Sequence, residues 1–150
     1  MIKLGEKAPN FTLLDTDRVE HSLSDYSGRN VVLLFFPLAF SRVCTTELCE
    51  VRDDLSQYNS LDVVILAISV DSLFSLQKFK AEQKYNFTIL SDWNKETARA
   101  YDALYEEFIL GMRGVSKRSA FVIDGNGYVR FAEVLENAGQ IPNFNSIKET

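Results

Sequence analysis

The sequence predicts an α/β fold in which a central mixed sheet is flanked by helices on both faces. Apolar runs of strand length alternate with amphipathic segments of helix length, which is the pattern of strand–helix–strand units. The 150 residues are 46% hydrophobic and 12% aromatic, a composition typical of one compact core. No composition break, repeat or low-complexity tract divides the chain, so we expect a single domain over residues 1–150.

The first third of the chain predicts a hairpin followed by a buried strand. Short apolar segments at 11–14 and 19–23 flank the polar turn Asp15-Thr16-Asp17, which favours an early β-hairpin. Every residue of 31–36 is apolar, as expected of a central strand that is covered on both faces. Pro37 ends this strand, because proline cannot donate to a β-ladder.

The remaining elements continue the alternation of strands and helices. Asp71 and Ser72 precede one helix as candidate caps, and Asp124-Gly125-Asn126-Gly127 is a strong hairpin turn between the last two strands. This order predicts a mostly parallel sheet that ends in an antiparallel hairpin, the arrangement of thioredoxin-like folds. We expect helices at 45–58, 73–85, 95–101 and within the last ten residues, and strands at 63–70, 88–90, 119–123 and 128–134.

Charge and apolar run length exclude several functional classes. The 16 basic and 21 acidic residues give a net charge of −5, which speaks against binding to nucleic acid or to an anionic membrane surface. No apolar run suits a signal peptide or a bilayer-spanning helix, so we expect a cytoplasmic protein. In such a reducing compartment, Cys44 and Cys49 are better explained as redox-active thiols than as a structural disulfide.

Chemically active residue types concentrate directly after the predicted strand at 31–36. Cys44 would lie in the first turn of the next helix, where free backbone amides and the helix dipole favour the thiolate, the form that attacks. Ser41 could turn its hydroxyl toward the sulfur and toward an oxygen of a bound substrate. Pro37 would shield the pocket without adding an N–H donor. Such a site suits one small polar substrate.

This segment resembles the peroxiredoxins, whose signature is Pro, three residues, Thr or Ser, two residues and the reactive Cys. Pro37, Ser41 and Cys44 match this spacing in order, and the likeness extends from 5–11 to 118–124. It is strongest to the small one-cysteine, alkyl hydroperoxide reductase E-like members and to the bacterioferritin-comigratory type. Serine replaces the commoner threonine here, a change that keeps the hydroxyl and loses a methyl group.

The resemblance implies a thiol-dependent peroxidase that reduces hydrogen peroxide or alkyl hydroperoxides through a sulfenic acid on Cys44. It assigns Ser41 as the hydroxyl residue, Pro37 as the shielding residue, and Arg118 as a guanidinium that stabilises the thiolate and the breaking O–O bond. Glu47 would partner an arginine or a backbone group, and a plain acid at a helix start explains it equally well. The family also implies a thioredoxin-like or other thiol reductant and no cofactor, and it allows a homodimer as well as a monomer.

Cys49 lies five residues beyond Cys44, the offset at which bacterioferritin-comigratory-type relatives can carry a resolving cysteine. On an intact helix, residues five apart are separated by about 8 to 9 Å between Cα atoms, whereas a disulfide tolerates about 7 Å at most. Resolution by Cys49 therefore requires the first helical turns to unwind. The other interpretation is an external thiol that attacks the sulfenic acid, with Cys49 as an apolar core residue.

Two other functional classes remain open at the level of the sequence. A thioredoxin-type thiol-disulfide oxidoreductase normally carries Cys-x-x-Cys, whereas four residues separate Cys44 from Cys49, and Ser41 would then have no obvious purpose. A redox-inert interaction module is the second alternative. No metal site is expected, because His21, the only histidine, has no ligand spacing to the cysteines. Trp93 is expected in the core or in a subunit contact.

Overall fold

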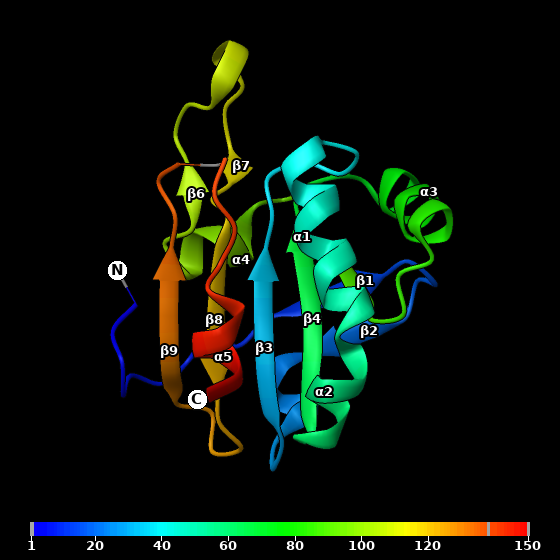
Figure 1. Ribbon diagram of the computed structural model, residues 1–150. Coiled ribbons are helices and arrows are strands. Elements are labelled where there is room, and N and C mark those ends of the chain that lie inside the picture. The colour runs from blue at the N-terminus through cyan, green and yellow to red at the C-terminus, as the bar shows by residue number, and fades with distance from the viewer. Residues whose placement is uncertain (1, 138, 150) are drawn as a thin grey trace.

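The computed structural model describes residues 2–137 and 139–149 (Figure 1). Within these residues, seven strands form one sheet: β1 (Thr12–Asp15), β2 (Glu20–Ser22), β3 (Asn30–Phe35), β4 (Val63–Ser69), β5 (Thr88–Ser91), β8 (Ser119–Ile123) and β9 (Val129–Val134). Their order across the sheet is β2-β1-β5-β4-β3-β8-β9. The sheet is mixed, and its centre is formed by β4 and β3.

Helices cover both faces of the sheet, which confirms the predicted thioredoxin-like α/β architecture. The helices are α1 (Arg42–Asp53), α2 (Leu55–Ser60), α3 (Leu73–Gln83), α4 (Glu96–Ala100) and α5 (Phe144–Glu149). Buried side chains of α1, α2, α3 and α5 pack on one face, while α4 and the N-terminal segment pack on the other. Strand β3 serves both layers, since Val32 and Leu34 face the first and Val31 and Leu33 face the second. None of the helices in the described residues is long and apolar enough to cross a membrane.

Both predicted hairpins are present. β1 pairs antiparallel with β2, and β8 pairs antiparallel with β9 across the turn at 124–127. The Asp124 carboxylate closes this turn by accepting hydrogen bonds from the backbone amides of Asn126 and Tyr128, both at 3.0 Å. Gly127 has φ +87, a left-handed conformation that glycine adopts without steric cost. The hairpin that the sequence predicted is therefore present, and the Asp124 carboxylate closes its turn.

The parallel part of the sheet is smaller than predicted. The β3–β4 and β4–β5 pairs are parallel, whereas the other neighbours in the sheet are antiparallel. Strand β1 adds to β5 in the antiparallel sense, and β8 returns antiparallel beside β3. Alternation of strands and helices indicates parallel neighbours only where a helix joins two adjacent strands. The expectation of a mostly parallel sheet was wrong for this reason.

The helix predicted at 45–58 begins earlier and is interrupted. α1 starts at Arg42, directly after Ser41, whose extended backbone (φ −70, ψ 150) makes it the N-cap. Asp54, with φ −99 and ψ 8, separates α1 from α2. The prediction followed apolar periodicity, which the first turn of α1 does not carry. The side chain of Ser41 makes no capping hydrogen bond, and its carbonyl accepts a hydrogen bond from the Thr45 amide at 2.9 Å.

An arm formed by residues 104–116 projects from one end of the molecule (yellow in Figure 1). It consists of β6 (Leu104–Tyr105) paired with β7 (Val115–Ser116), with the short helix η2 (Ile109–Gly111) between them. The sequence did not predict this hairpin, because two-residue strands show no alternation of apolar and polar side chains. The arm rises at the same end of the molecule as the first turn of α1 (Figure 1).

Candidate active site

The Cys44 thiol lies at the junction between β3 and α1. Phe36 still pairs with β4, since its amide donates to the carbonyl of Ile68 at 3.0 Å, and the buried Pro37 follows it. α1 begins at Arg42, so Cys44 occupies its first turn, where backbone amides have no acceptor within the helix. The Cys44 side chain is fully buried. The end of a central strand thus delivers one thiol to the positive end of a helix dipole.

The loop before α1 is held by Asp71. Its carboxylate accepts a hydrogen bond from the backbone amide of Ala39 at 2.8 Å. Phe40 in the same loop has φ +67, which costs a non-glycine residue about 1 to 2 kcal/mol, and its ring lies 5.0 Å from the ring centroid of Phe79. Ser72 caps α3, so Asp71, which the sequence offered as a helix cap, instead fixes the loop that carries the reactive segment.

Arg118 brings a guanidinium against Cys44 from the strand beside β3. It directly precedes β8, whose antiparallel register places Ser119 opposite Phe35 at the end of β3. Nη2 of Arg118 lies 3.1 Å from Sγ of Cys44, and Nη1 lies 2.6 Å from Oε1 of Glu47. Arg118 is 2% exposed, and Cys44 and Glu47 are 0% exposed. One planar guanidinium therefore joins the buried thiol and the buried carboxylate.

Burial raises the pKa of Glu47 to about 7, although the charge and the hydrogen bond of Arg118 act in the opposite direction. Among the described residues, Oε2 of Glu47 is buried without a hydrogen-bond partner. Burial alone would lower the pKa of Arg118, but the nearby Glu47 and Cys44 outweigh it, and the pKa of Arg118 is raised. The cluster thus keeps a permanent cation beside the sulfur, next to a carboxyl group that exchanges its proton near neutral pH.

The hydroxyl of Ser41 bonds to the loop rather than to the sulfur. Its Oγ donates to the carbonyl of Leu38 at 2.9 Å, and no hydrogen bond joins it to Cys44 within the described part of the chain. The interpretation in which this hydroxyl turns toward the sulfur therefore does not describe the resting geometry. The cause is local, because a serine readily bonds to a backbone carbonyl three or four residues earlier.

A cleft of about 700 Å³ opens between the first turn of α1 and the arm. Ser41, Val43 and Arg118 line it on one side, and Tyr105 and Phe108 line it on the other. The two aromatic rings stack with their centroids 4.9 Å apart. Cys44 itself does not line the cleft, whereas Arg118, which contacts the Cys44 sulfur, does. The aromatic wall is suited to the apolar part of an organic substrate.

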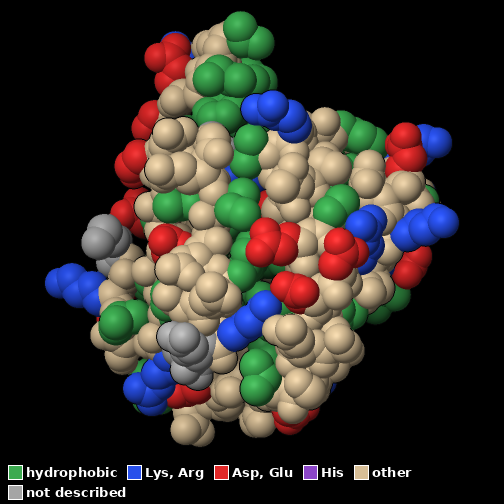
Figure 2. Space-filling model, viewed as in Figure 1, with side chains coloured by type: hydrophobic (Ala, Val, Ile, Leu, Met, Phe, Trp, Pro, Cys, Tyr) green, Lys and Arg blue, Asp and Glu red, His purple; other side chains and the backbone are tan. Residues whose placement is uncertain are grey.

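The tip of the arm is apolar and exposed. Ile109 and Leu110 are 63% and 94% exposed, and hydrophobic side chains gather over the arm in the space-filling view (Figure 2). No residue of the arm is among the site residues that the sequence predicts. The only signal was the close succession of aromatic and aliphatic side chains around two glutamates in 104–110, which no periodicity distinguishes from a surface loop.

Cys49 lies on the same helix as Cys44 but in a different environment. Its Sγ is 3.6 Å from Oε1 of Gln83 and 3.7 Å from the hydroxyl oxygen of Tyr85. Its side chain is partly buried, and both cysteines are free thiols. Because α1 is continuous from Arg42 to Asp53, the structure does not bring the two sulfur atoms together.

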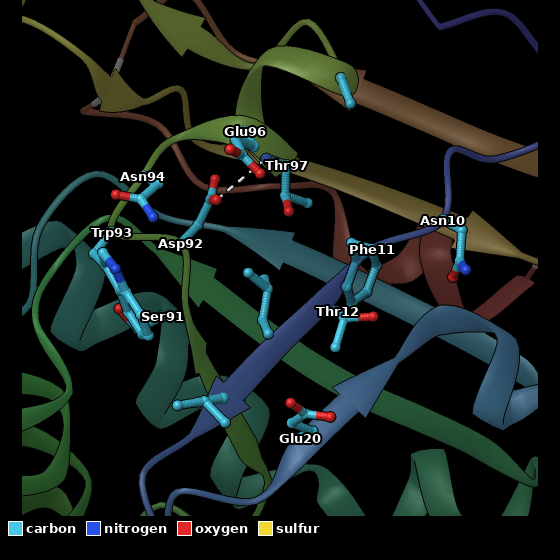
Figure 3. A pocket seen from close by; sticks show the side chains of 13 residues that line it. Asn10, Phe11, Thr12, Glu20, Ser91, Asp92, Trp93, Asn94, Glu96 and Thr97 are labelled. Carbon is cyan, nitrogen blue, oxygen red and sulfur yellow. Dashed lines mark hydrogen bonds between the residues drawn. The ribbon is translucent and has the colours of Figure 1, made fainter.

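A second cavity, of about 390 Å³, is lined by residues of β1, β5 and α4 (Figure 3). None of the predicted site residues lines it. Its buried carboxylate, Asp92, already caps α4 by accepting hydrogen bonds from the amides of Thr97 at 3.1 Å and Ala98 at 2.8 Å. Trp93 lies at this cavity and is 45% exposed, so it is not a core residue. This cavity is separate from the thiol chemistry.

His21 is fixed on the edge strand β2 by two side chains. Its Nε2 lies 2.7 Å from Oδ2 of Asp15, and its Nδ1 lies 2.7 Å from the Tyr26 hydroxyl oxygen. It is partly buried rather than a plain surface residue of the strand. Across the residues that the structure describes, no group of three or more His, Cys, Asp or Glu side chains is placed to hold a metal ion.

A thioredoxin-like fold with a buried thiol at a strand–helix junction and a guanidinium against it defines a thiol-based redox protein. The model of the AhpC/TSA family matches residues 4–132. The chain belongs to this family, the peroxiredoxins, and it is a thiol-dependent peroxidase.

Known relatives cover most of the chain. Alkyl hydroperoxide reductase E of Mycobacterium bovis is 36% identical over 137 residues, which are 89% of this chain and 86% of the relative. The Bcp peroxiredoxin of Coxiella burnetii is 39% identical over 132 residues, 85% of each chain. Among solved structures, peroxidoxin BcpB of Mycobacterium tuberculosis matches with a TM-score of 0.83 and 27% identity over 93% of this chain and 90% of that one. A mitochondrial 2-Cys peroxiredoxin of Plasmodium falciparum matches with a TM-score of 0.83 and 30% identity over 98% of this chain and 90% of that one.

Proposed function

We propose that Cys44 is the peroxidatic thiol. The observation that carries this assignment is the 3.1 Å contact between its sulfur and Nη2 of Arg118. The Cys44 thiolate attacks the terminal oxygen of a hydroperoxide, so that an S–O bond forms while the O–O bond breaks. Two electrons pass from sulfur to oxygen, the sulfur becomes a sulfenic acid, and the departing oxygen takes up a proton to leave as water or an alcohol.

The other side chains of the cluster support this step in different ways. Arg118 stabilises the thiolate and then the negative charge that develops on the peroxide oxygens. Glu47 positions Arg118 through the 2.6 Å ion pair. Ser41 exchanges its bond to the Leu38 carbonyl for one to the peroxide, and Pro37 keeps a competing N–H out of the pocket. Hydrogen peroxide and alkyl hydroperoxides both fit these roles.

We propose that Cys49 regenerates the enzyme. Its thiol attacks the sulfenic sulfur, water leaves, and a disulfide forms that a thioredoxin-like dithiol reduces. This step requires α1 to unwind, because the two residues are five apart on a continuous helix. An external thiol that attacks the sulfenic acid directly is the alternative route. The route through Cys49 is favoured because Cys49 is partly exposed, so its sulfur is less enclosed than that of Cys44.

We further propose that residues 1–150 form a single domain that works in the cytoplasm and pairs as a homodimer. Two continuous hydrophobic clusters share one sheet, which favours a single folding unit. The exposed Ile109 and Leu110 at the tip of the arm supply apolar surface beside the cleft for contact with a second copy. Sedimentation of the wild type and of a Leu110→Asp variant tests the pairing, and a monomeric wild type would contradict it.

The decisive experiment is intact-mass spectrometry after one equivalent of peroxide. The wild type is expected to lose two hydrogen atoms as the disulfide closes. Cys49→Ser is expected to gain one oxygen on Cys44, and Cys44→Ser is expected to stay unchanged. If Cys49→Ser turns over as fast as the wild type with a dithiol reductant, the resolving role is excluded. If Cys44→Ser still consumes peroxide, the assignment of the reactive thiol is wrong.

A further inference from the structure

Tyr85 lies where α3 turns back toward α1. α3 ends at Gln83, two residues before the predicted end at 85, because Lys84 adopts φ 55 and ψ 42, the left-handed cap conformation. This cap directs Tyr85 inward, where its ring lies 5.1 Å from the ring of Phe79 and 5.3 Å from that of Phe87. The residue is 4% exposed. The ring belongs to the same hydrophobic cluster as the buried side chains of α1, and the hydroxyl group is the part of Tyr85 that can form hydrogen bonds.

That hydroxyl contacts α1 between the two cysteines. It donates to the backbone carbonyl of Thr45 at 3.4 Å, and its oxygen is 3.7 Å from Sγ of Cys49. Burial, together with the contact to Cys49, raises the pKa of Tyr85, so the group stays a neutral donor. The Tyr85 hydroxyl can therefore donate to the Thr45 carbonyl.

The Thr45 carbonyl is also the acceptor that the helix assigns to the amide of Cys49. A carbonyl oxygen has two lone pairs, so it can accept from the Cys49 amide and from the Tyr85 hydroxyl together. The Cys49 amide must leave this acceptor when the helix unwinds for disulfide closure. Tyr85 thus stabilises the peptide group that has to move, while it makes no hydrogen bond to Cys44 or Arg118 within the described residues.

From these contacts we propose that the Tyr85 hydroxyl is a latch on α1, which sets how fast the helix opens and hence how the Cys44 sulfenic acid is partitioned. The proposal rests on the resolving role of Cys49 in the proposed function. After opening, the Cys49 sulfur attacks the sulfenic sulfur and water leaves. While the helix stays closed, a second hydroperoxide can transfer an oxygen to the sulfenic acid, giving a sulfinic acid and water or an alcohol. A tighter latch favours the sulfinic product.

Tyr85→Phe isolates the latch, because it removes one oxygen atom and keeps the buried ring. Loss of one neutral hydrogen bond should speed closure of the disulfide by about 2- to 10-fold. Rapid-quench mass spectrometry then follows sulfenic acid, disulfide and sulfinic acid separately. We expect an unchanged rate of sulfenic acid formation, faster closure, and a ratio of sulfinic acid to disulfide that is lowered by the same factor. A substitution that only reduced the overall stability would not speed disulfide closure while it left the rate of sulfenic acid formation unchanged.

Tyr58→Phe is the matched control, since Tyr58 is another buried tyrosine of the same layer, is 2% exposed and makes no hydrogen bond to α1 within the described residues. It should leave the rates of both steps unchanged. If the disulfide of the Tyr85→Phe protein closes at the wild-type rate, the latch is overturned. A wild type that forms no disulfide overturns the resolving role instead, and amide hydrogen exchange then decides on the latch. Faster exchange of the Cys49 amide in Tyr85→Phe supports it, and unchanged exchange overturns it.

Discussion

Replacing Arg118 by lysine tests the contact on which the proposed chemistry depends. The substitution keeps a positive charge but removes the planar fork that reaches Sγ of Cys44 at 3.1 Å and Oε1 of Glu47 at 2.6 Å at the same time. A single ammonium opposite the buried carboxylate leaves the sulfur without its donor. Loss of one charge-assisted hydrogen bond of about 1.5 to 3 kcal/mol lowers the rate of sulfenic acid formation roughly 10- to 150-fold.

The assay is rapid-quench formation of the sulfenic acid in a Cys49→Ser background, where disulfide closure does not consume the product. Arg42→Lys is the matched control, because Arg42 lines the same cleft but is exposed. It should change the rate constant by less than about threefold, as expected for an exposed charge. Thermal unfolding of each variant separates a chemical effect from a folding defect. An Arg118→Lys protein that remains folded and reacts at the wild-type rate would refute the role of the guanidinium.

Three further predictions address the hydroxyl, the buried carboxyl and the core. Ser41→Ala should lower kcat/KM for peroxide about 10-fold while Ser41→Thr stays near the wild type; equal rates for both would exclude a hydroxyl contact in the transition state. Because burial raises the pKa of Glu47 from its ordinary 4.5 to about 7, the folded state binds its proton more tightly. The free energy of unfolding should therefore fall by up to about 3 kcal/mol as pH rises from 4.5 to 7. Urea titrations should show this slope in the wild type and not in Glu47→Gln, and parallel slopes would contradict the assignment. Leu34→Ala, at a fully buried position of β3, should cost about 2 to 5 kcal/mol of stability in the same titrations.

The reactive segment could be predicted from the sequence because its signals are local. The apolar run at 31–36 identifies the buried strand, and Pro37, Ser41 and Cys44 follow within eight residues of its end. The start of α1 was harder to place, because its first turn precedes the apolar periodicity on which the prediction rested. The orientation of the Ser41 hydroxyl was missed because a serine can bond either to its own backbone or to a neighbour, and only the loop geometry decides between them.

The partners of the two thiols could not be derived from local pattern. Arg118 is 74 residues from Cys44 and meets it through the register of β3 with β8, which no short segment encodes. Only the family resemblance pointed to this arginine. For Cys49, the contacts of Gln83 and Tyr85 depend on the left-handed cap that ends α3, whereas periodicity alone extended that helix to 85.

One helix therefore holds two chemically identical thiols in two electrostatic settings. Cys44 is buried in the first turn with a guanidinium hydrogen-bonded to its sulfur at 3.1 Å, whereas the hydrogen-bond partners of the Cys49 sulfur are the neutral oxygens of Gln83 and Tyr85. A donated charge-assisted hydrogen bond favours a sulfur anion, which supports the proposal that peroxide chemistry starts at Cys44. The same continuous helix that creates this difference also keeps the two sulfur atoms apart. The proposed cycle thus needs the helix intact for the first step and opened for the second, and the Tyr85 latch that we propose would set the exchange between them.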